Sequence, residues 1–200
     1  PKSYFSPYKN KYLEDGPKGE YLTDRLTDEA IGFIKEYKDQ PFFLSMAYYS
    51  VHTPLQGKEE LVQKYKDKEP ADGHSNPVYA AMIHSVDANI GRLMKLLDDL
   101  DLAENTVVVF CSDNGGVYRI TKQWPLRAGK GSYYEGGIRE PLIVRYPGKV
   151  EAGTKSDEPV CGIDFYPTFL ELAGIQKPKG KMLDGRSFAP ILKNTEQRMP

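Results

Sequence analysis

Thr106-Val-Val-Val-Phe-Cys-Ser-Asp-Asn-Gly-Gly116 has the pattern of a buried strand that ends in a sharp turn. The residues from Val107 to Phe110 are β-branched or aromatic, a continuous apolar run typical of a strand covered on both faces. Adjacent strand residues point to opposite faces, so Asp113 and Asn114 can share one ligand only if the backbone leaves the strand there. We expect Gly115 and Gly116 to allow that exit, because glycine reaches backbone angles closed to other residues.

The pair Asp113-Asn114 has two interpretations at this point. A carboxylate and an amide carbonyl side by side suit a hard cation such as calcium. Asp-Asn-Gly is also common turn chemistry, so a simple surface turn explains the same residues. This run alone leaves both interpretations open.

The composition indicates an ordinary globular chain and excludes two classes of partner. The 200 residues are 40% hydrophobic and 28% charged, which fits one domain or part of a larger one. The net charge of −1 gives no electrostatic case for binding nucleic acid or an anionic membrane surface. No apolar stretch approaches the length that crosses a bilayer, so we expect no membrane partner. Cys111 and Cys161 do not form a disulfide framework.

Hydrophobic spacing predicts helices that alternate with apolar strands. The first 20 residues have the composition of a loop. The expected helices cover residues 22–37, 58–65, 78–100, 166–173 and 188–192, and the expected strands cover 42–48, 107–110 and 141–146. This alternation predicts an α/β fold with a mainly parallel sheet flanked by helices. In such sheets ligands bind at the carboxyl ends of strands, where Asp113-Asn114 would lie.

Three loops that follow apolar runs carry reactive residue types. His52 follows the first predicted strand, Asp113-Asn114 follows the second, and Lys130 stands between two glycines in a third loop. A lysine near a cation and an imidazole suits an anionic ester, because it neutralises charge and assists a leaving oxygen. Each piece also has a plain structural explanation: a flexible Gly-Lys-Gly loop, a turn at 135–137, or a structural histidine. His84 is expected on a helix surface.

These segments together resemble a known family. The matching segments are Tyr21-Leu-Thr-Asp-Arg25, Pro41-Phe-Phe-Leu44 running on to His52-Thr-Pro54, Ser112-Asp-Asn-Gly-Gly116, Gly129-Lys-Gly131 with Tyr134-Glu-Gly-Gly-Ile-Arg-Glu-Pro141, Asp164-Phe-Tyr-Pro-Thr168 and Leu183-Asp-Gly-Arg-Ser187. They resemble, in order and spacing, the type I formylglycine-dependent sulfatases of the alkaline phosphatase-like superfamily. The resemblance runs from about Tyr4 to Leu192 and implies the incomplete fold of a sulfatase catalytic domain.

The resemblance implies a role for each candidate residue. Asp113 and Asn114 match a pair of calcium ligands, with magnesium as the other possible metal. Lys130 matches a lysine that contacts the sulfate, and His52 matches a histidine that binds a sulfate oxygen and protonates the leaving alcohol. The implied substrate is a sulfated small molecule or glycan. Two alternatives remain: a phosphoester or phosphonate ester hydrolase of the same superfamily, against which Asn114 argues because its two-metal members tend to carry histidine there, or a non-catalytic remnant.

The chain departs from the family pattern in its missing nucleophile. The family converts the cysteine of a Cys-x-Pro-Ser-Arg-like motif to formylglycine, and neither Cys111 nor Cys161 lies in such a motif. Calcium takes six to eight oxygens, of which two are evident here, and Asp87 and Asp164 have simple structural explanations in helical contexts.

We therefore expect residues 1–200 to be the central to C-terminal part of a catalytic domain. The N-terminal strands, the formylglycine and a C-terminal subdomain would be absent, leaving the chain inactive alone and prone to form oligomers through an exposed sheet edge. A periplasmic, secreted or lysosomal location follows only from the resemblance.

Overall fold

The computed structural model describes residues 2–193, which divide into two compact units. The first unit contains residues 2–103 and 110–143, and the second contains residues 104–109 and 144–193. All four predicted site residues, His52, Asp113, Asn114 and Lys130, belong to the first unit.

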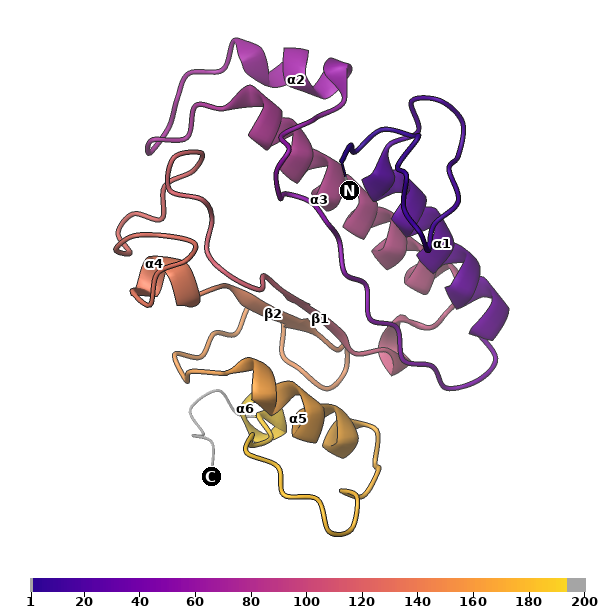
Figure 1. Cartoon of the computed structure of the whole chain (residues 1–200). Helices are drawn as coiled ribbons and strands as arrows, with labels where there is room; N and C mark the ends of the chain where they lie inside the picture. Colours follow the sequence, from indigo (N-terminus) through magenta and orange to yellow (C-terminus); the bar gives the residue numbers. More distant parts are fainter. Residues whose placement is uncertain (1, 194–200) are drawn as a thin grey trace. The chain divides into compact units, whose positions relative to one another are not determined.

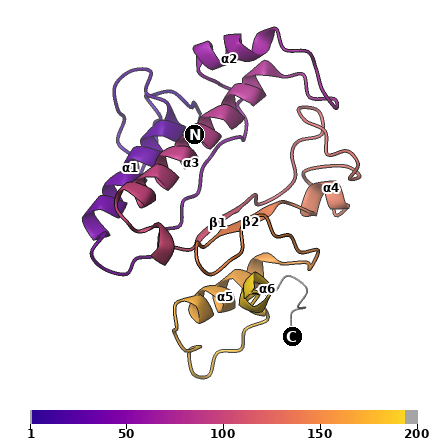
Figure 2. The ribbon, with the colours of Figure 1, turned by 180° about the vertical axis from the view of Figure 1, so that it is seen from behind.

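Three helices frame the first unit and confirm the predicted helical ranges. They are α1 (Leu22–Tyr37), α2 (Glu59–Lys66) and α3 (Pro77–Asp99). Both α1 and α2 pack against α3, as Figures 1 and 2 show from opposite sides. The start of α3 is fixed by Asn76, whose side chain accepts a hydrogen bond from the Tyr79 backbone N–H at 3.0 Å, and by Pro77 in the first turn.

The buried face of α3 is more polar than its apolar spacing predicts. Ser85 and Asn89 are buried there, whereas the apolar residues Val86 and Ile90 of the same helix are only partly buried. Asn89 Nδ2 donates to Asp24 Oδ1 of α1 at 2.7 Å, and Ser85 Oγ donates to the Ala81 carbonyl at 2.9 Å. These hydrogen bonds make the polar face tolerable inside the unit, because buried polar groups are costly only when unpaired.

Residues 2–20 form a loop, as predicted, but two of their tyrosines belong to the core. Tyr4 and Tyr8 are fully buried and cluster with Tyr21, Leu22 and Met82. Each phenol that enters this cluster finds an acceptor; the Tyr21 hydroxyl, for example, donates to the Gln56 carbonyl at 2.8 Å. Buried tyrosines need such partners, so the N-terminal loop is held as firmly as a regular element.

The described residues contain two strands, β1 (Val108–Cys111) and β2 (Leu142–Arg145), which hydrogen-bond to each other. Beyond them, the Gly115 N–H donates to the Gly137 carbonyl at 3.1 Å. The contact thus continues from the carboxyl end of β1 to the residues before β2, as between antiparallel neighbours. This pair does not test the predominance of parallel strands.

Two details of the strand predictions are wrong. Residues 42–48 are extended, with alternating exposed and partly buried side chains, but they belong to neither strand. The expectation that β1 is covered on both faces also fails, since Val108 and Val109 are partly buried while Phe110 and Cys111 are exposed. An apolar run indicates that a strand tends to be buried. Among the described residues, no element covers Phe110 and Cys111 of β1.

The second unit contains η2 (Gly162–Asp164), α5 (Phe165–Leu172) and α6 (Ala189–Lys193). The Asp164 carboxylate accepts hydrogen bonds from the Cys161 and Arg186 backbone N–H groups at 2.7 and 2.8 Å. Asp164 therefore ties two loops together, which confirms its structural role. The short elements η1 (Ala103–Asn105) and α4 (Glu135–Ile138) complete the set. Within residues 2–193, no helix combines the length and apolarity required to cross a membrane.

Candidate active site

Backbone hydrogen bonds join the two glycine-rich segments of the predicted site. The Lys130 N–H donates to the Gly116 carbonyl at 3.0 Å, and the Gly136 N–H donates to the Arg127 carbonyl at 2.9 Å. Together with the Gly115–Gly137 bond, they place the turn after β1 directly against the Gly-Lys-Gly loop and α4. We call this arrangement, residues 115–116, 129–131 and 136–137, the glycine frame.

The glycines are required because the backbones touch. A Cβ atom built on Gly115 would lie 1.9 Å from the Gly136 carbonyl oxygen, and one on Gly129 would lie 2.5 Å from the Gly116 carbonyl oxygen. This corrects the expectation for Gly115 and Gly116, neither of which has a positive φ. They serve close packing of the backbone instead of an unusual turn; Gly131, with φ of +84°, is the position that needs left-handed backbone.

Asp113 and Asn114 lie just beyond the carboxyl end of β1, as predicted. Asp113 is exposed and Asn114 is partly buried. Their turn is held by Ser112, whose Oγ donates to the Asn114 carbonyl at 2.9 Å. This bond uses the backbone oxygen and leaves the Asn114 side-chain oxygen for a ligand.

Glu140 is a site residue that the sequence analysis missed. Its pKa is raised, first by burial and second by the negative charge of Asp113. The pKa of the Cys111 thiol is raised by the same two causes, and that of Tyr79 is raised by burial and by Glu140. Two carboxylates therefore concentrate negative charge beside the turn after β1. The sequence does place Glu140 just before β2. That position predicts a place near Asp113 only once β1 and β2 are known to be neighbours.

The Lys130 side chain is exposed at the edge of the glycine frame. Its backbone is fixed on both sides, by its own N–H bond to Gly116 and by the bond from the Ser132 N–H to the Gly129 carbonyl at 3.1 Å. A long flexible ammonium on a fixed backbone suits contact with an anion brought to this edge.

His52 stands on a separate loop of the same unit. Its imidazole is exposed, its Nδ1 lies 2.8 Å from the Thr53 carbonyl oxygen, and its ring centroid lies 5.3 Å from that of Tyr49. The buried Tyr4 hydroxyl donates to the His52 carbonyl at 2.7 Å and to the Tyr49 carbonyl at 3.0 Å, which anchors the loop to the core. With Nδ1 engaged, Nε2 is the nitrogen left for chemistry.

The structure brings some of these predicted site residues together, but not all of them. The glycine frame brings Asp113-Asn114 and the backbone of Lys130 together. Among residues 2–193, no hydrogen bond or ion pair links the His52 side chain to those of Asp113, Asn114 or Lys130.

The donor set at the turn suits a hard cation but does not complete its shell. No cluster of three or more His, Cys, Asp or Glu side chains in the described part of the chain is arranged to hold a metal. Asp113 and Asn114 offer one carboxylate and one amide oxygen, the ligand types that calcium takes. The pKa of Glu140 is raised first by burial and second by the negative charge of Asp113, and a bound cation would offset the second of these causes. These residues fit one part of a calcium site.

Comparison with known proteins assigns the chain to a family. A family model described as Sulfatase matches residues 2–175. The chain belongs to the sulfatase family. It is 40% identical over 199 residues to a sulfatase of Formosa agariphila, covering 92% of this chain and 36% of that protein. It is 36% identical to human steryl-sulfatase, covering 88% of this chain and 30% of the relative. The chain thus spans about a third of these relatives.

Solved structures confirm the fold class. The chain superposes on Ps i-CgsB, solved in complex with k-i-k-neocarrahexaose, with a TM-score of 0.81 and 38% identity over 89% of this chain and 40% of that one. A phosphonate monoester hydrolase from Silicibacter pomeroyi matches with a TM-score of 0.66 at 21% identity, which shows a shared fold alone. The chain is thus a partial α/β domain of the alkaline phosphatase-like fold.

Proposed function

We propose that the full-length gene product carrying this chain is a sulfatase that hydrolyses sulfate esters to an alcohol and inorganic sulfate. The observation that supports this most directly is the glycine frame, which fixes the Lys130 backbone against the turn bearing Asp113 and Asn114. The similarity to the Formosa agariphila sulfatase and human steryl-sulfatase supports the same reaction.

Each predicted residue has a task in this proposal. Lys130 neutralises a sulfate oxygen and so stabilises negative charge that develops as the ester bond breaks. His52 donates a proton from Nε2 to the leaving alcohol. Asp113 and Asn114 hold calcium, with magnesium as the alternative ion, and a bound cation would supply a further positive charge for the sulfate. Glu140 tunes the charge next to Asp113. The formylglycine nucleophile would come from a Cys-x-Pro-Ser-Arg-like motif outside these 200 residues.

A sulfated glycan is the substrate class we favour. Ps i-CgsB, a structure with bound neocarrahexaose, matches at 38% identity with a TM-score of 0.81. The name of the human relative points instead to a sterol substrate. A glycan substrate agrees with a periplasmic, secreted or lysosomal location, which stays an expectation from the family.

The test is sulfate release by the full-length gene product, loaded with calcium and carrying the modified cysteine, from sulfate esters and from matched phosphate and phosphonate esters. Sulfate esters should be turned over, and Lys130→Met should lower kcat by about 10² to 10³-fold, the usual effect of removing one group that stabilises an oxyanion. Lys95→Met is the matched control, since Lys95 is an exposed α3 lysine paired with Asp99.

Two results would overturn the proposal: no sulfate released from any ester, or faster turnover of phosphonate esters than of sulfate esters. Calcium is tested separately by its effect on the unfolding temperature. Added calcium should raise the unfolding temperature of the unmutated protein, and Asp113→Ala should reduce that rise.

A further inference from the structure

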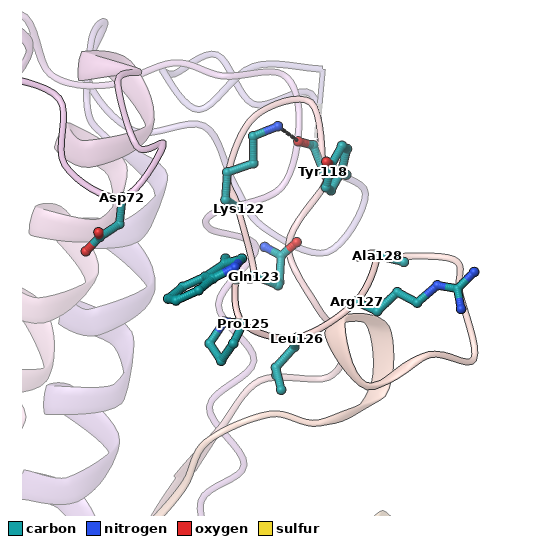
Figure 3. A pocket seen from close by; sticks show the side chains of 9 residues that line it. Asp72, Tyr118, Lys122, Gln123, Pro125, Leu126, Arg127 and Ala128 are labelled. Atoms are coloured by element: carbon teal, nitrogen blue, oxygen red, sulfur yellow. Dashed lines mark hydrogen bonds between the residues drawn. The ribbon is translucent and has the colours of Figure 1, made fainter.

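A hollow of about 500 Å³ lies in the first unit, between the loop that follows Gly116 and the turn at residues 71–74. Figure 3 shows Asp72 on one side of it and Lys122, Gln123 and Pro125 on the other. Small-molecule sites in proteins commonly measure about 300 to 1,000 Å³. The residues used below are Asp72, Tyr118, Lys122, Trp124, Pro125 and Leu126.

The turn that presents Asp72 is fastened to the opposite loop. Ala71 and His74 form an antiparallel bridge, and the two residues between them, Asp72 and Gly73, have φ of 49° and 80°. A hydrogen bond of 2.9 Å joins His74 Nδ1 to the Oγ1 of Thr121, which is only 7% exposed. Asp72 is therefore held at the hollow by a tight turn with its own anchor.

The opposite wall includes three neighbouring apolar side chains. Trp124, the single tryptophan of the chain, is 83% exposed and continues into Pro125 and Leu126. An indole left this open to water has apolar area to bury against a ligand. A sugar ring could contact both walls. Its C–H face would stack on Trp124, and its hydroxyls would donate hydrogen bonds to the Asp72 carboxylate.

The charged side chains at the hollow are one carboxylate, Asp72, and two cations, Lys122 and Arg127. Lys122 Nζ lies 4.0 Å from the Tyr118 ring centroid and donates to the Tyr118 carbonyl at 3.5 Å. The Arg127 guanidinium lies 3.8 Å from the ring centroid of Tyr134, and Figure 3 shows it extending away from Asp72. Contacts with neutral rings leave the charge of each cation in place, so the lining carries one negative and two positive charges and accommodates a neutral or a sulfated ring.

The hollow is lined by the loop that connects two segments of the glycine frame. Its loop starts at Gly116 and returns at Gly129, next to Lys130. The Gln123 side chain packs against this frame: its Oε1 lies 2.7 Å from where a Cβ on Gly129 would stand, and among the described residues this buried oxygen has no hydrogen-bond partner. We propose that this hollow is a subsite for a second sugar ring of the substrate glycan, next to the sulfated ring held at Lys130. The assignment rests on the proposed sulfatase function.

The test compares two substrates of the full-length gene product: 4-nitrophenyl sulfate, which has no second sugar, and k-i-k-neocarrahexaose with a panel of glycosaminoglycan oligosaccharides. Trp124→Ala should lower kcat/KM by at least tenfold more on the oligosaccharide that is cleaved fastest than on 4-nitrophenyl sulfate, through a higher KM. Trp124→Tyr should restore most of the loss, and Asp72→Ala should share it. Tyr12→Ala is the control, because Tyr12 is an 87% exposed aromatic on a different loop.

Binding gives a second readout that does not require turnover. The oligosaccharide should change the tryptophan emission of the unmutated protein, and that change should be absent in Trp124→Phe. The outcomes are separable. If no ester is cleaved, the sulfatase proposal fails. If 4-nitrophenyl sulfate is cleaved but no oligosaccharide is, or if Trp124→Ala affects both substrates equally, the sugar subsite is overturned while the sulfatase proposal stands.

Discussion

Backbone contact, more than side-chain chemistry, accounts for the residues around Lys130. Gly115, Gly129 and Gly136 each occupy a point where a carbonyl oxygen fills the space of a Cβ atom. The sequence shows the glycines, and a family resemblance shows that they belong together, but a pattern cannot reveal which carbonyl each one meets. At this scale the candidate ligands Asp113 and Asn114 were predictable from their position after an apolar run, whereas Glu140 was not, because its proximity depends on strand pairing.

Gly136→Ala should disrupt the glycine frame. The new Cβ would lie 2.4 Å from the Ala128 carbonyl oxygen and 2.5 Å from that of Arg127, and backbone atoms cannot move aside cheaply. We expect a loss of about 1–3 kcal/mol in the free energy of unfolding, as for other overpacked sites, together with a large loss of activity.

The matched control is Gly32→Ala, an exposed position in α1 where the new Cβ meets no atom within 4 Å. It should stabilise the protein by about 0.5–1 kcal/mol, since alanine is the better helix former. Urea unfolding of both variants measures the difference. Equal stability of the two would show that the frame tolerates a side chain.

At the scale of elements, periodicity predicted the helices well and the strands less well. The bounds of α1, α2, α3 and α5 fall within two residues of the expected ranges. The spacing of apolar residues and the capping residues that define a helix all lie within a short stretch of sequence. The strand prediction for residues 42–48 was wrong because a strand forms only with a partner strand, and the sequence of one segment does not show where that partner lies. The burial of the tyrosines in the N-terminal loop was also not predicted, because it comes from tertiary contacts with α1 and α3.

The contact between α1 and α3 should depend on Asn89. Its side chain, 2% exposed, donates to Asp24 Oδ1 and accepts from Arg92 Nη1 at 2.9 Å, while Arg92 also pairs with Asp28 of α1. Asn89→Ala removes two hydrogen bonds to charged side chains, so the free energy of unfolding should fall by about 1–3 kcal/mol.

Asp87→Ala, at an exposed position on the same helix, is the comparison. This substitution raises helix propensity about as much as Asn89→Ala does. It should change the free energy of unfolding by less than about 0.5 kcal/mol. Chemical denaturation and amide hydrogen exchange in α1 report the result. If Asn89→Ala behaves like Asp87→Ala, the polar face contributes nothing to joining the helices.

At the scale of the whole molecule, the tyrosine core predicts alkaline instability. Burial raises the pKa of Tyr21 from 10.0 to about 12, and it raises the pKa values of Tyr4 and Tyr8 as well. Below pH 10 the phenols are protonated in both the folded and unfolded states, so their contribution is complete. Between pH 10 and 12 the unfolded state loses the Tyr21 proton while the folded state keeps it, and stability falls by up to about 3 kcal/mol for this residue.

Unfolding midpoints in urea from pH 8 to 12 measure this fall. Tyr21→Phe should be less stable at pH 8, because its hydrogen bond to the Gln56 carbonyl is lost, but its stability should decline less steeply above pH 10. Tyr12→Phe, at an exposed position, should follow the unmutated protein throughout. Parallel curves for all three proteins would contradict the assigned pKa shift.

The last prediction concerns the chain of 200 residues expressed alone. Phe110 of β1 and Ile143 of β2 are 41% and 57% exposed, and Ile138 beside them is 62% exposed. Exposed apolar side chains on a short two-stranded sheet offer both a hydrophobic surface and an edge for another chain. The isolated chain should therefore self-associate, and Ile143→Lys should lower its mass measured by light scattering after gel filtration. Lys95→Met, which changes an exposed side chain of α3, should not. A monomer that unfolds cooperatively would show instead that these side chains need no cover, and it would remove the reason for expecting oligomers through the sheet edge.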